Sequence, residues 1–172
     1  MYDMLKTRRS IRKFQDREVE KEKIDIILKS ALLSPSSRSR RPWEFIAVTD
    51  KSLLDELSRC REHSSAFLKG APLGIVIVAD PKLCDVWIED TSIAATIIQL
   101  SAHSQGLGSC WIQVRDRHGA DNIKATDYIG GILGIPSQYT VECMIAIGYP
   151  NEKKNAYTEG DLLYSKLHYN GY

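Results

Sequence analysis

Two basic stretches of the chain carry enough cationic and hydroxyl side chains to hold an anion. The first puts four cations and a hydroxyl within six residues: Arg8, Arg9, Ser10, Arg12 and Lys13. A guanidinium group presents its donors as a planar fork that matches phosphate oxygens, so this spacing predicts a phosphate site. Taken alone, such a run is more often a solvated basic surface, and a second feature is needed to support a ligand.

The second basic stretch runs from residue 34 to residue 43. Its hydroxyls, arginines and backbone N–H groups suit an anion or the polar edge of a ring, although an ordinary exposed connection has the same composition. A third stretch contains Gly106 and Gly108, followed by Ser109, Cys110 and Trp111. Two glycines let the backbone approach a ligand closely, and the same pair is equally typical of a helix end.

Hydrophobic periodicity predicts the elements that position these stretches. Apolar residues at helical spacing indicate helices over residues 21–33, 53–57, 87–105 and 122–133. Short apolar runs indicate strands over residues 45–48, 73–79, 110–114 and 141–147. The run over 73–79 is β-branched and almost wholly apolar, which is typical of a central strand covered on both faces. Mixed elements of this kind predict an α+β layered domain.

Composition narrows the classes of protein further. The chain has 172 residues, of which 43% are hydrophobic, enough for one domain with a sizeable core and too little for two. With a formal net charge of +1, no overall field draws it to nucleic acid or to an anionic membrane. No apolar run approaches the roughly 20 residues of a membrane helix, so we expect a cytoplasmic protein. The four cysteines stand far apart, which predicts free, buried thiols and no metal site.

Three motifs together resemble the nitroreductase family. Residues 8–14 read Arg-Arg-Ser-Ile-Arg-Lys-Phe, similar to the family's Arg-Arg-Ser-(Val/Ile)-Arg-x-Phe signature. Residues 35–43 resemble its Pro-Ser-(Ser/Ala)-x-Asn-x-Gln-Pro-Trp stretch, and residues 106–111 its Gly-Leu-Gly-(Ser/Thr)-Cys-Trp stretch. Residues 148–150 match its Gly-Tyr-Pro. The likeness spans nearly the whole chain and indicates a compact subgroup of the family.

The resemblance implies a bound FMN. Arg8 would pair with the phosphate, Arg9 and Ser10 would hold phosphate or ribityl oxygens, and Arg12 would reach the pyrimidine edge. Lys153 and Lys154 are both candidates for the phosphate. The remaining expected cofactor-binding residues are Pro35, Ser36, Ser37, Arg38, Ser39, Gly108, Ser109, Cys110, Trp111 and Gly148. Ser39 and Arg41 stand where the family has Asn and Gln, and the added charge of Arg41 favours an acidic acceptor.

The implied activity is that of an FMN-dependent oxidoreductase. NAD(P)H would give a hydride to N5 of the flavin, and a nitroaromatic, quinone or similar acceptor would then take the same place, which predicts ping-pong kinetics. No catalytic side chain is expected, because the flavin carries the chemistry. Two alternatives stay open: a dehalogenase-like or flavin-converting member of the family, and a non-enzymatic nucleotide- or phosphate-binding module.

The implied fold is a three-layer α+β arrangement in which helices flank a central, mainly antiparallel mixed sheet. We expect residues 1–172 to form a single FMN-binding domain, in a homodimer with FMN sites at the subunit interface. Residues 151–172 are expected to form a C-terminal arm that is exchanged in the dimer and packs on the partner subunit. This tail carries more apolar and aromatic side chains than a free tail usually does: Leu162, Leu163, Tyr164, Leu167, Tyr169 and Tyr172.

Overall fold

The computed structural model describes the backbone of residues 1–172 and every side chain except that of Asp121. Its centre is a four-stranded sheet in the order β1-β2-β4-β3, in which every neighbouring pair is antiparallel. The strands are β1 (Trp43–Val48), β2 (Leu73–Ala79), β3 (Gly108–Gln113) and β4 (Thr140–Gly148). The predicted central strand is confirmed, because β2 lies between β1 and β4 and is buried along its whole length.

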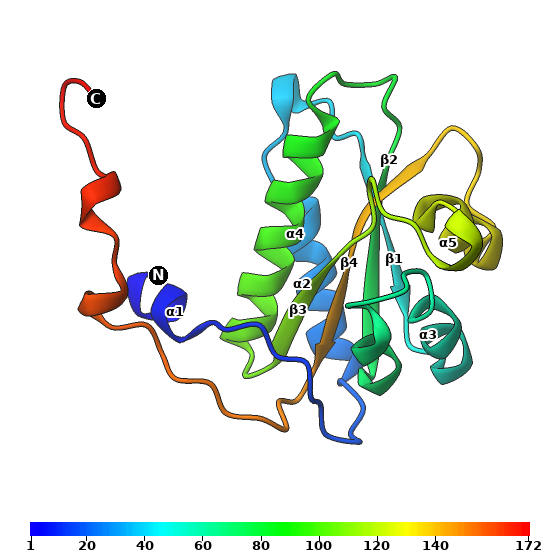
Figure 1. Cartoon of the computed structure of the whole chain (residues 1–172), viewed down its shortest axis with the longest axis horizontal. Helices are drawn as coiled ribbons and strands as arrows, with labels where there is room; N and C mark the ends of the chain where they lie inside the picture. Colours follow the sequence, from blue (N-terminus) through cyan, green and yellow to red (C-terminus); the bar gives the residue numbers. More distant parts are fainter.

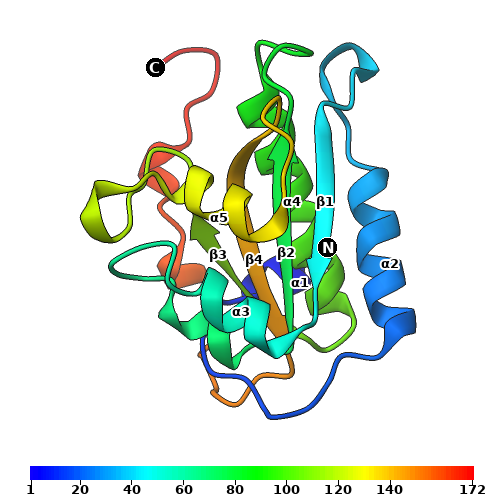
Figure 2. The ribbon, with the colours of Figure 1, turned by 90° about the vertical axis from the view of Figure 1, so that its right-hand side faces the viewer.

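Helices cover both faces of the sheet. One face carries α2 (Lys21–Leu32) and α4 (Trp87–Ser104), and the other carries α3 (Lys51–Leu57) and α5 (Ala125–Leu133) (Figure 2). Side chains alternate between the faces along a strand, so Ile75 and Ile77 pack with the first helix pair while Val76 and Val78 pack with the second. The predicted three-layer α+β fold is confirmed.

Two helices differ from the sequence-based expectation. The helix expected from residue 122 begins at Ala125, because Asn122 is left-handed with φ of 57° and Ile123 is extended. The sequence also did not predict α1 (Tyr2–Thr7), a single short helix with no buried residue. Short helices are marginal on their own, so α1 depends on contacts made elsewhere in the chain.

Some of those contacts come from the C-terminal arm, residues 151–172. The arm leaves the end of β4, runs beside α1 and projects away from the body of the domain (Figure 1). The Tyr157 N–H donates to the Lys6 carbonyl at 2.9 Å, and the Glu159 carboxylate accepts the Tyr2 and Tyr164 hydroxyls at 2.8 and 2.7 Å. The arm and α1 therefore form one unit held by polar contacts.

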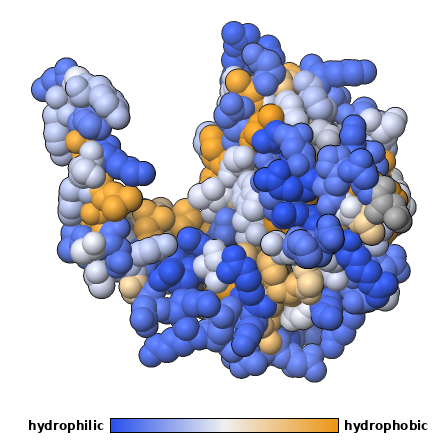
Figure 3. Space-filling model, viewed as in Figure 1, coloured by the Kyte–Doolittle hydropathy of each residue, from blue (hydrophilic) through white to orange (hydrophobic). Residues whose placement is uncertain are grey.

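The apolar side chains of the arm are not covered by its own chain. Leu163, Leu167 and Tyr169 are 63%, 58% and 85% exposed. Apolar side chains lie both on the arm and on the side of the body that faces it (Figure 3). None of the described helices combines the length and the apolar character that a membrane-spanning segment requires. The four cysteines are free and buried, as predicted.

Candidate functional site

The first basic stretch lies along the edge of the sheet. Ser10 forms a parallel bridge with Ser109 of β3, and the Ile11 N–H donates to the Ser109 carbonyl at 3.0 Å. A β-carbon added at Gly108 would stand 2.8 Å from the Ile11 side chain, too close for any other residue. Glycine at this position therefore lets the first and third sequence motifs lie in contact.

The segment after β4 pairs with the same basic stretch. The Asn151 N–H donates to the Lys13 carbonyl at 2.8 Å. The Glu152 carboxylate accepts the backbone N–H groups of Arg12 and Lys13 at 2.5 and 3.1 Å and lies 3.0 Å from the Lys154 ammonium. The backbone hydrogen bond from Arg12, followed by that from Lys154, lowers the Glu152 pKa to about 2. Glu152 is thus ionised, and both of its carboxylate oxygens have partners.

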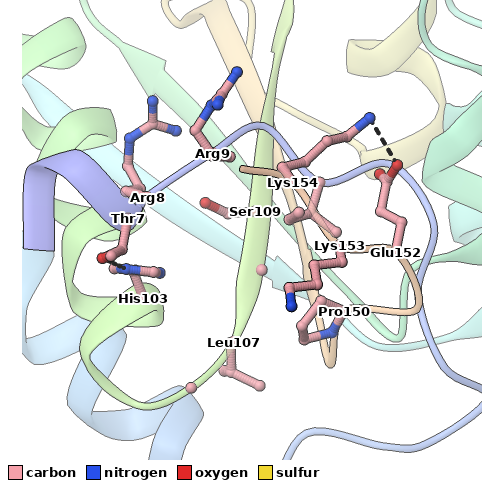
Figure 4. A pocket seen from close by; sticks show the side chains of 13 residues that line it. Thr7, Arg8, Arg9, His103, Leu107, Ser109, Pro150, Glu152, Lys153 and Lys154 are labelled. Atoms are coloured by element: carbon pink, nitrogen blue, oxygen red, sulfur yellow. Dashed lines mark hydrogen bonds and ion pairs between the residues drawn. The ribbon is translucent and has the colours of Figure 1, made fainter. Parts of the chain in front are cut away.

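Together these segments line a pocket of about 230 Å³ (Figure 4). Its walls contain six of the predicted site residues: Arg8, Arg9, Gly108, Ser109, Lys153 and Lys154. Glu152 is the one acidic side chain among the lining residues, and it is already committed to backbone N–H groups and to Lys154. An excess of cations in a concave site favours an anion with several oxygens, such as a phosphate group.

Two of the predicted arginines extend beyond this pocket. The Arg9 guanidinium donates to the Asn155 carbonyl and lies 4.2 Å from the centre of the Tyr157 ring, so it contacts both the pocket and the arm. The Arg12 guanidinium is exposed and stands 5.7 Å from the ring centre of Phe67. Arg8 lines the pocket and Arg12 does not, but both line a hollow that adjoins it.

The third motif supplies the wall beside Arg12. Cys110 is buried, and this burial raises the pKa of its thiol even though the Arg12 charge acts in the opposite direction. Cys110 is therefore a neutral thiol at physiological pH, not a nucleophile. Trp111 is partly buried and donates from Nε1 to the Gln113 side chain at 3.0 Å. Gly148, like Gly108, leaves no room for a side chain, because a β-carbon there would stand 2.5 Å from Pro72.

The second basic stretch lies at the other end of α4. The Ser37 N–H donates at 2.9 Å to the buried carboxylate of Asp90, in the first turn of the helix. The pocket instead adjoins His103, in the last turn. At about 1.5 Å per residue, the 13 positions between Asp90 and His103 span roughly 20 Å. One chain therefore does not bring the predicted residues Pro35, Ser36, Ser37, Arg38 and Ser39 to the pocket.

This second stretch, the loop 34–43, is held in an unusual conformation. Arg38, Ser39 and Arg41 all have left-handed φ angles, of 50°, 54° and 50°. Non-glycine residues in this region cost energy and are frequent at functional sites. The Ser36 hydroxyl accepts the Arg41 N–H at 2.9 Å, which fixes the turn.

The loop also has unsatisfied polar groups at both ends. Ser34 and Trp43 are each only 6% exposed, and neither the Ser34 hydroxyl nor the Trp43 Nε1 has a hydrogen-bond partner among the described groups. Both atoms are enclosed by residues of their own chain.

Sequence reasoning missed several residues of the site. His103 lines the pocket and its Nε2 lies 2.9 Å from the Thr7 hydroxyl. Asp90 anchors the loop 34–43, and Glu152 anchors the first basic stretch. The signal available for His103 was its place in the turn before Gly106. The left-handed φ of +78° at Gly106 agrees with the helix end that the glycine pair indicated.

Comparison with known proteins gives consistent matches over the whole chain. The model of the Nitroreductase family matches residues 5–64 and 57–149. A protein of Archaeoglobus fulgidus, provisionally named NADH dehydrogenase/NAD(P)H nitroreductase, is 38% identical over 92% of this chain and 90% of its own. A solved structure of an FMN-dependent nitroreductase from Clostridium difficile R20291 is 60% identical, with a TM-score of 0.98 over 100% of both chains. The iodotyrosine deiodinase of Thermotoga neapolitana is 24% identical over 95% of each chain.

Proposed function

The chain belongs to the nitroreductase family, and we propose that it is an FMN-dependent oxidoreductase that takes electrons from NAD(P)H and passes them to a small oxidised acceptor. The observation that carries the proposal is the convergence of residues 8–12, 106–111 and 148–154 on one cationic pocket. These segments are far apart in the sequence, and the sheet edge brings them together.

The residues of the pocket fit the phosphate end of FMN. Arg8, Lys153 and Lys154 supply cations, and Ser109, near the start of β3, lines the pocket with them. Arg9 and Ser10 would hold phosphate or ribityl oxygens; they line an adjoining hollow together with Arg8, Arg12, Lys154 and Tyr157. Charge-assisted hydrogen bonds of this kind are short and strong, so the phosphate would fix the position of the cofactor.

The other end of the cofactor would lie along the third motif. Arg12 would reach the pyrimidine edge, and the backbone of residues 108–111 would lie beside the ring. When bound, FMN would accept a hydride from NAD(P)H and donate it to the acceptor at its N5 atom. A cation near the pyrimidine edge stabilises the negative charge of the reduced state, which is the role we assign to Arg12. No side chain of the chain needs to act as a nucleophile.

A complete site would need a second copy of the chain. The pocket of about 230 Å³ is smaller than the roughly 300–1,000 Å³ of a pocket that encloses a small ligand. The loop 34–43 lies too far from it to contribute within one chain. In a homodimer, the partner's copy of this loop would close each site, and the arm of residues 151–172 would pack on the partner. The exposed apolar side chains of the arm, Leu163, Leu167 and Tyr169, support this arrangement.

The test is to purify the full chain and record its absorbance in the flavin bands. We expect a yellow protein that releases FMN on denaturation. NAD(P)H oxidation should depend on a nitroaromatic or quinone acceptor, with the parallel initial-velocity lines of a ping-pong mechanism. Iodotyrosine, tested as an acceptor beside them, distinguishes a dehalogenase. A colourless protein that takes up phosphate but neither FMN nor NAD(P)H electrons would contradict the proposal and favour a binding module.

A further inference from the structure

The tautomer of His103 is fixed by its neighbour. Its Nε2 lies 2.9 Å from the Thr7 hydroxyl oxygen, which in turn lies 3.0 and 3.2 Å from the Asp3 and Met4 carbonyl oxygens. A helical threonine commonly directs its single hydroxyl proton to a carbonyl of the preceding turn. The Thr7 oxygen then accepts from His103, and this arrangement places a proton on Nε2.

The other ring nitrogen, Nδ1, is consequently the atom that gains a proton when the ring becomes charged. In the neutral ring it carries a lone pair, and in the charged ring it carries a second N–H donor. Nδ1 is turned away from Thr7, in the wall of the pocket that also holds Arg8 and Arg9 (Figure 4). A neutral His103 therefore presents no donor to an anion from this atom, whereas a protonated His103 does.

The surroundings of His103 favour its neutral form while the pocket holds no anion. Burial, and then the positive charge of Arg8, lower its pKa. The charged groups that line the pocket with it are mostly cations: Arg8 and Arg9 of the first basic stretch, Lys153 and Lys154 after β4, and Glu152, which is already paired with Lys154. In the neighbouring helices, Lys6 of α1 is paired with Asp3, and Lys23 of α2 with Glu20. A dianion placed among these groups reverses the balance and favours the protonated ring.

We propose that His103 is a proton-dependent ligand of this pocket, which takes up a proton when a phosphate-type dianion binds and then donates a hydrogen bond to it from Nδ1. The identity of the physiological ligand rests on the proposed function, in which the phosphate of FMN occupies the pocket. Inorganic phosphate has the same chemistry, and the two sources are separated by experiment.

Sulfate is the probe of choice because, unlike a phosphate monoester with a pKa near 6, it stays a dianion over the whole pH range used. We expect the full-length protein to bind sulfate roughly fivefold more tightly at about pH 5.5 than at about pH 8. His103→Gln should reduce this dependence to less than about twofold, because the amide does not titrate. His63→Gln, at an exposed histidine outside the pocket, is the matched control and should behave like the wild type.

A second measurement follows the ring directly. In nuclear magnetic resonance titrations, sulfate should move the midpoint of the His103 signals to higher pH and leave those of His63 in place. The inference is overturned if His103→Gln keeps the wild-type pH dependence, if sulfate does not move the His103 midpoint, or if no sulfate binds at either pH.

Titration with FMN and with inorganic phosphate then identifies the ligand. If FMN binds at least about tenfold more tightly than inorganic phosphate, the pocket belongs to a larger FMN site as proposed. A protein that binds sulfate through His103 but does not take up FMN would support the role of His103 and overturn the proposed function instead.

Discussion

The Glu152 carboxylate accepts the backbone N–H of Arg12 at 2.5 Å. This contact joins the two ends of the chain at the cationic pocket. Because the carboxylate is directed at backbone N–H groups, Arg8 and Arg9 stay free of it and face the pocket with their charge. A single acidic residue thus organises the site without removing its positive potential.

Glu152→Gln should weaken the fold above about pH 4.5 and have little effect near pH 2. The folded chain lowers the Glu152 pKa to about 2 from an ordinary value of 4.5. Since the folded pKa is the lower one, the stabilisation is fully present above pH 4.5 and is lost as the pH falls toward 2. At neutral pH the free energy of unfolding should fall by roughly 1.5–3 kcal/mol, measured by urea denaturation. Glu62→Gln, at an exposed site, is the control, and a pH-independent loss would contradict this role.

Arg8→Ala should leave a folded protein that binds FMN about ten- to hundredfold more weakly, because one charge-assisted contact to phosphate contributes roughly 1.5–3 kcal/mol. Riboflavin, which lacks the phosphate, should bind the variant and the wild type equally. Both affinities are read by fluorescence titration. Arg59→Ala, on the exposed side of the helix end near Asp55, is the matched control. FMN affinity within twofold of the wild type would show that Arg8 does not hold the phosphate.

Arg12→Ala should retain FMN but lower its reduction potential and slow its reduction by NAD(P)H. In the proposed site the Arg12 cation would stabilise the reduced state. Since about 1.4 kcal/mol corresponds to 30 mV for a two-electron couple, a shift of roughly 20–60 mV is expected. Spectroelectrochemistry measures the shift, and Arg12→Lys should restore part of it. An unchanged potential would remove Arg12 from the pyrimidine edge.

The layers of the fold could be predicted from periodicity because each element buries one face or two. The continuous apolar run of 73–79 has no polar face, and only a central position in the sheet satisfies it. The short helix α1 could not be predicted, since it buries nothing and is held by Tyr157, Glu159 and His103, which are all distant from it in the sequence.

The sequence could predict which residues form the site, but not how they are arranged in space. The motifs named the cations, and the structure brings Arg8, Arg9, Lys153 and Lys154 together. No local pattern indicates that Glu152 would reach Arg12, or that His103 would reach Thr7, because these pairs meet only once the sheet is formed. The position of the loop 34–43 likewise follows from the length of α4, which separates it from the pocket of its own chain.

Arg41→Gln should reduce the preference of the enzyme for acidic acceptors. Arg41 is exposed in the strained loop and has no ion pair among the described side chains, so its charge is available to an acceptor. We expect the ratio of kcat/KM for 4-nitrobenzoate to that for 4-nitrobenzyl alcohol to fall by about fivefold, the effect of an exposed ion pair of roughly 1 kcal/mol. Arg40→Gln is the control, because the Leu83 carbonyl already holds that guanidinium. A ratio that does not change would show that Arg41 does not contact the acceptor.

Removal of the arm after Asn155 should abolish both dimerisation and FMN binding. At roughly 25 cal/mol per Å², each large apolar side chain moved from water into an interface contributes about 1.5–3 kcal/mol before ordering costs. Leu163, Leu167 and Tyr169 are exposed in the single chain, so a partner would gain this burial. The truncation also removes Tyr157, on whose ring Arg9 lies, and with it a contact between the arm and the pocket.

A gentler variant separates the interface from the pocket. Leu163→Ser with Leu167→Ser keeps Tyr157 and Glu159, and therefore the contacts of the arm with α1. A ligand that binds only the assembled form stabilises it by mass action, so this variant should dimerise more weakly and regain the dimer as FMN is added. Sedimentation with flavin absorbance recorded alongside measures both, and Lys166→Ser is the polar control in the same turn. A full-length monomer that carries one FMN per chain would show that the site needs no second copy.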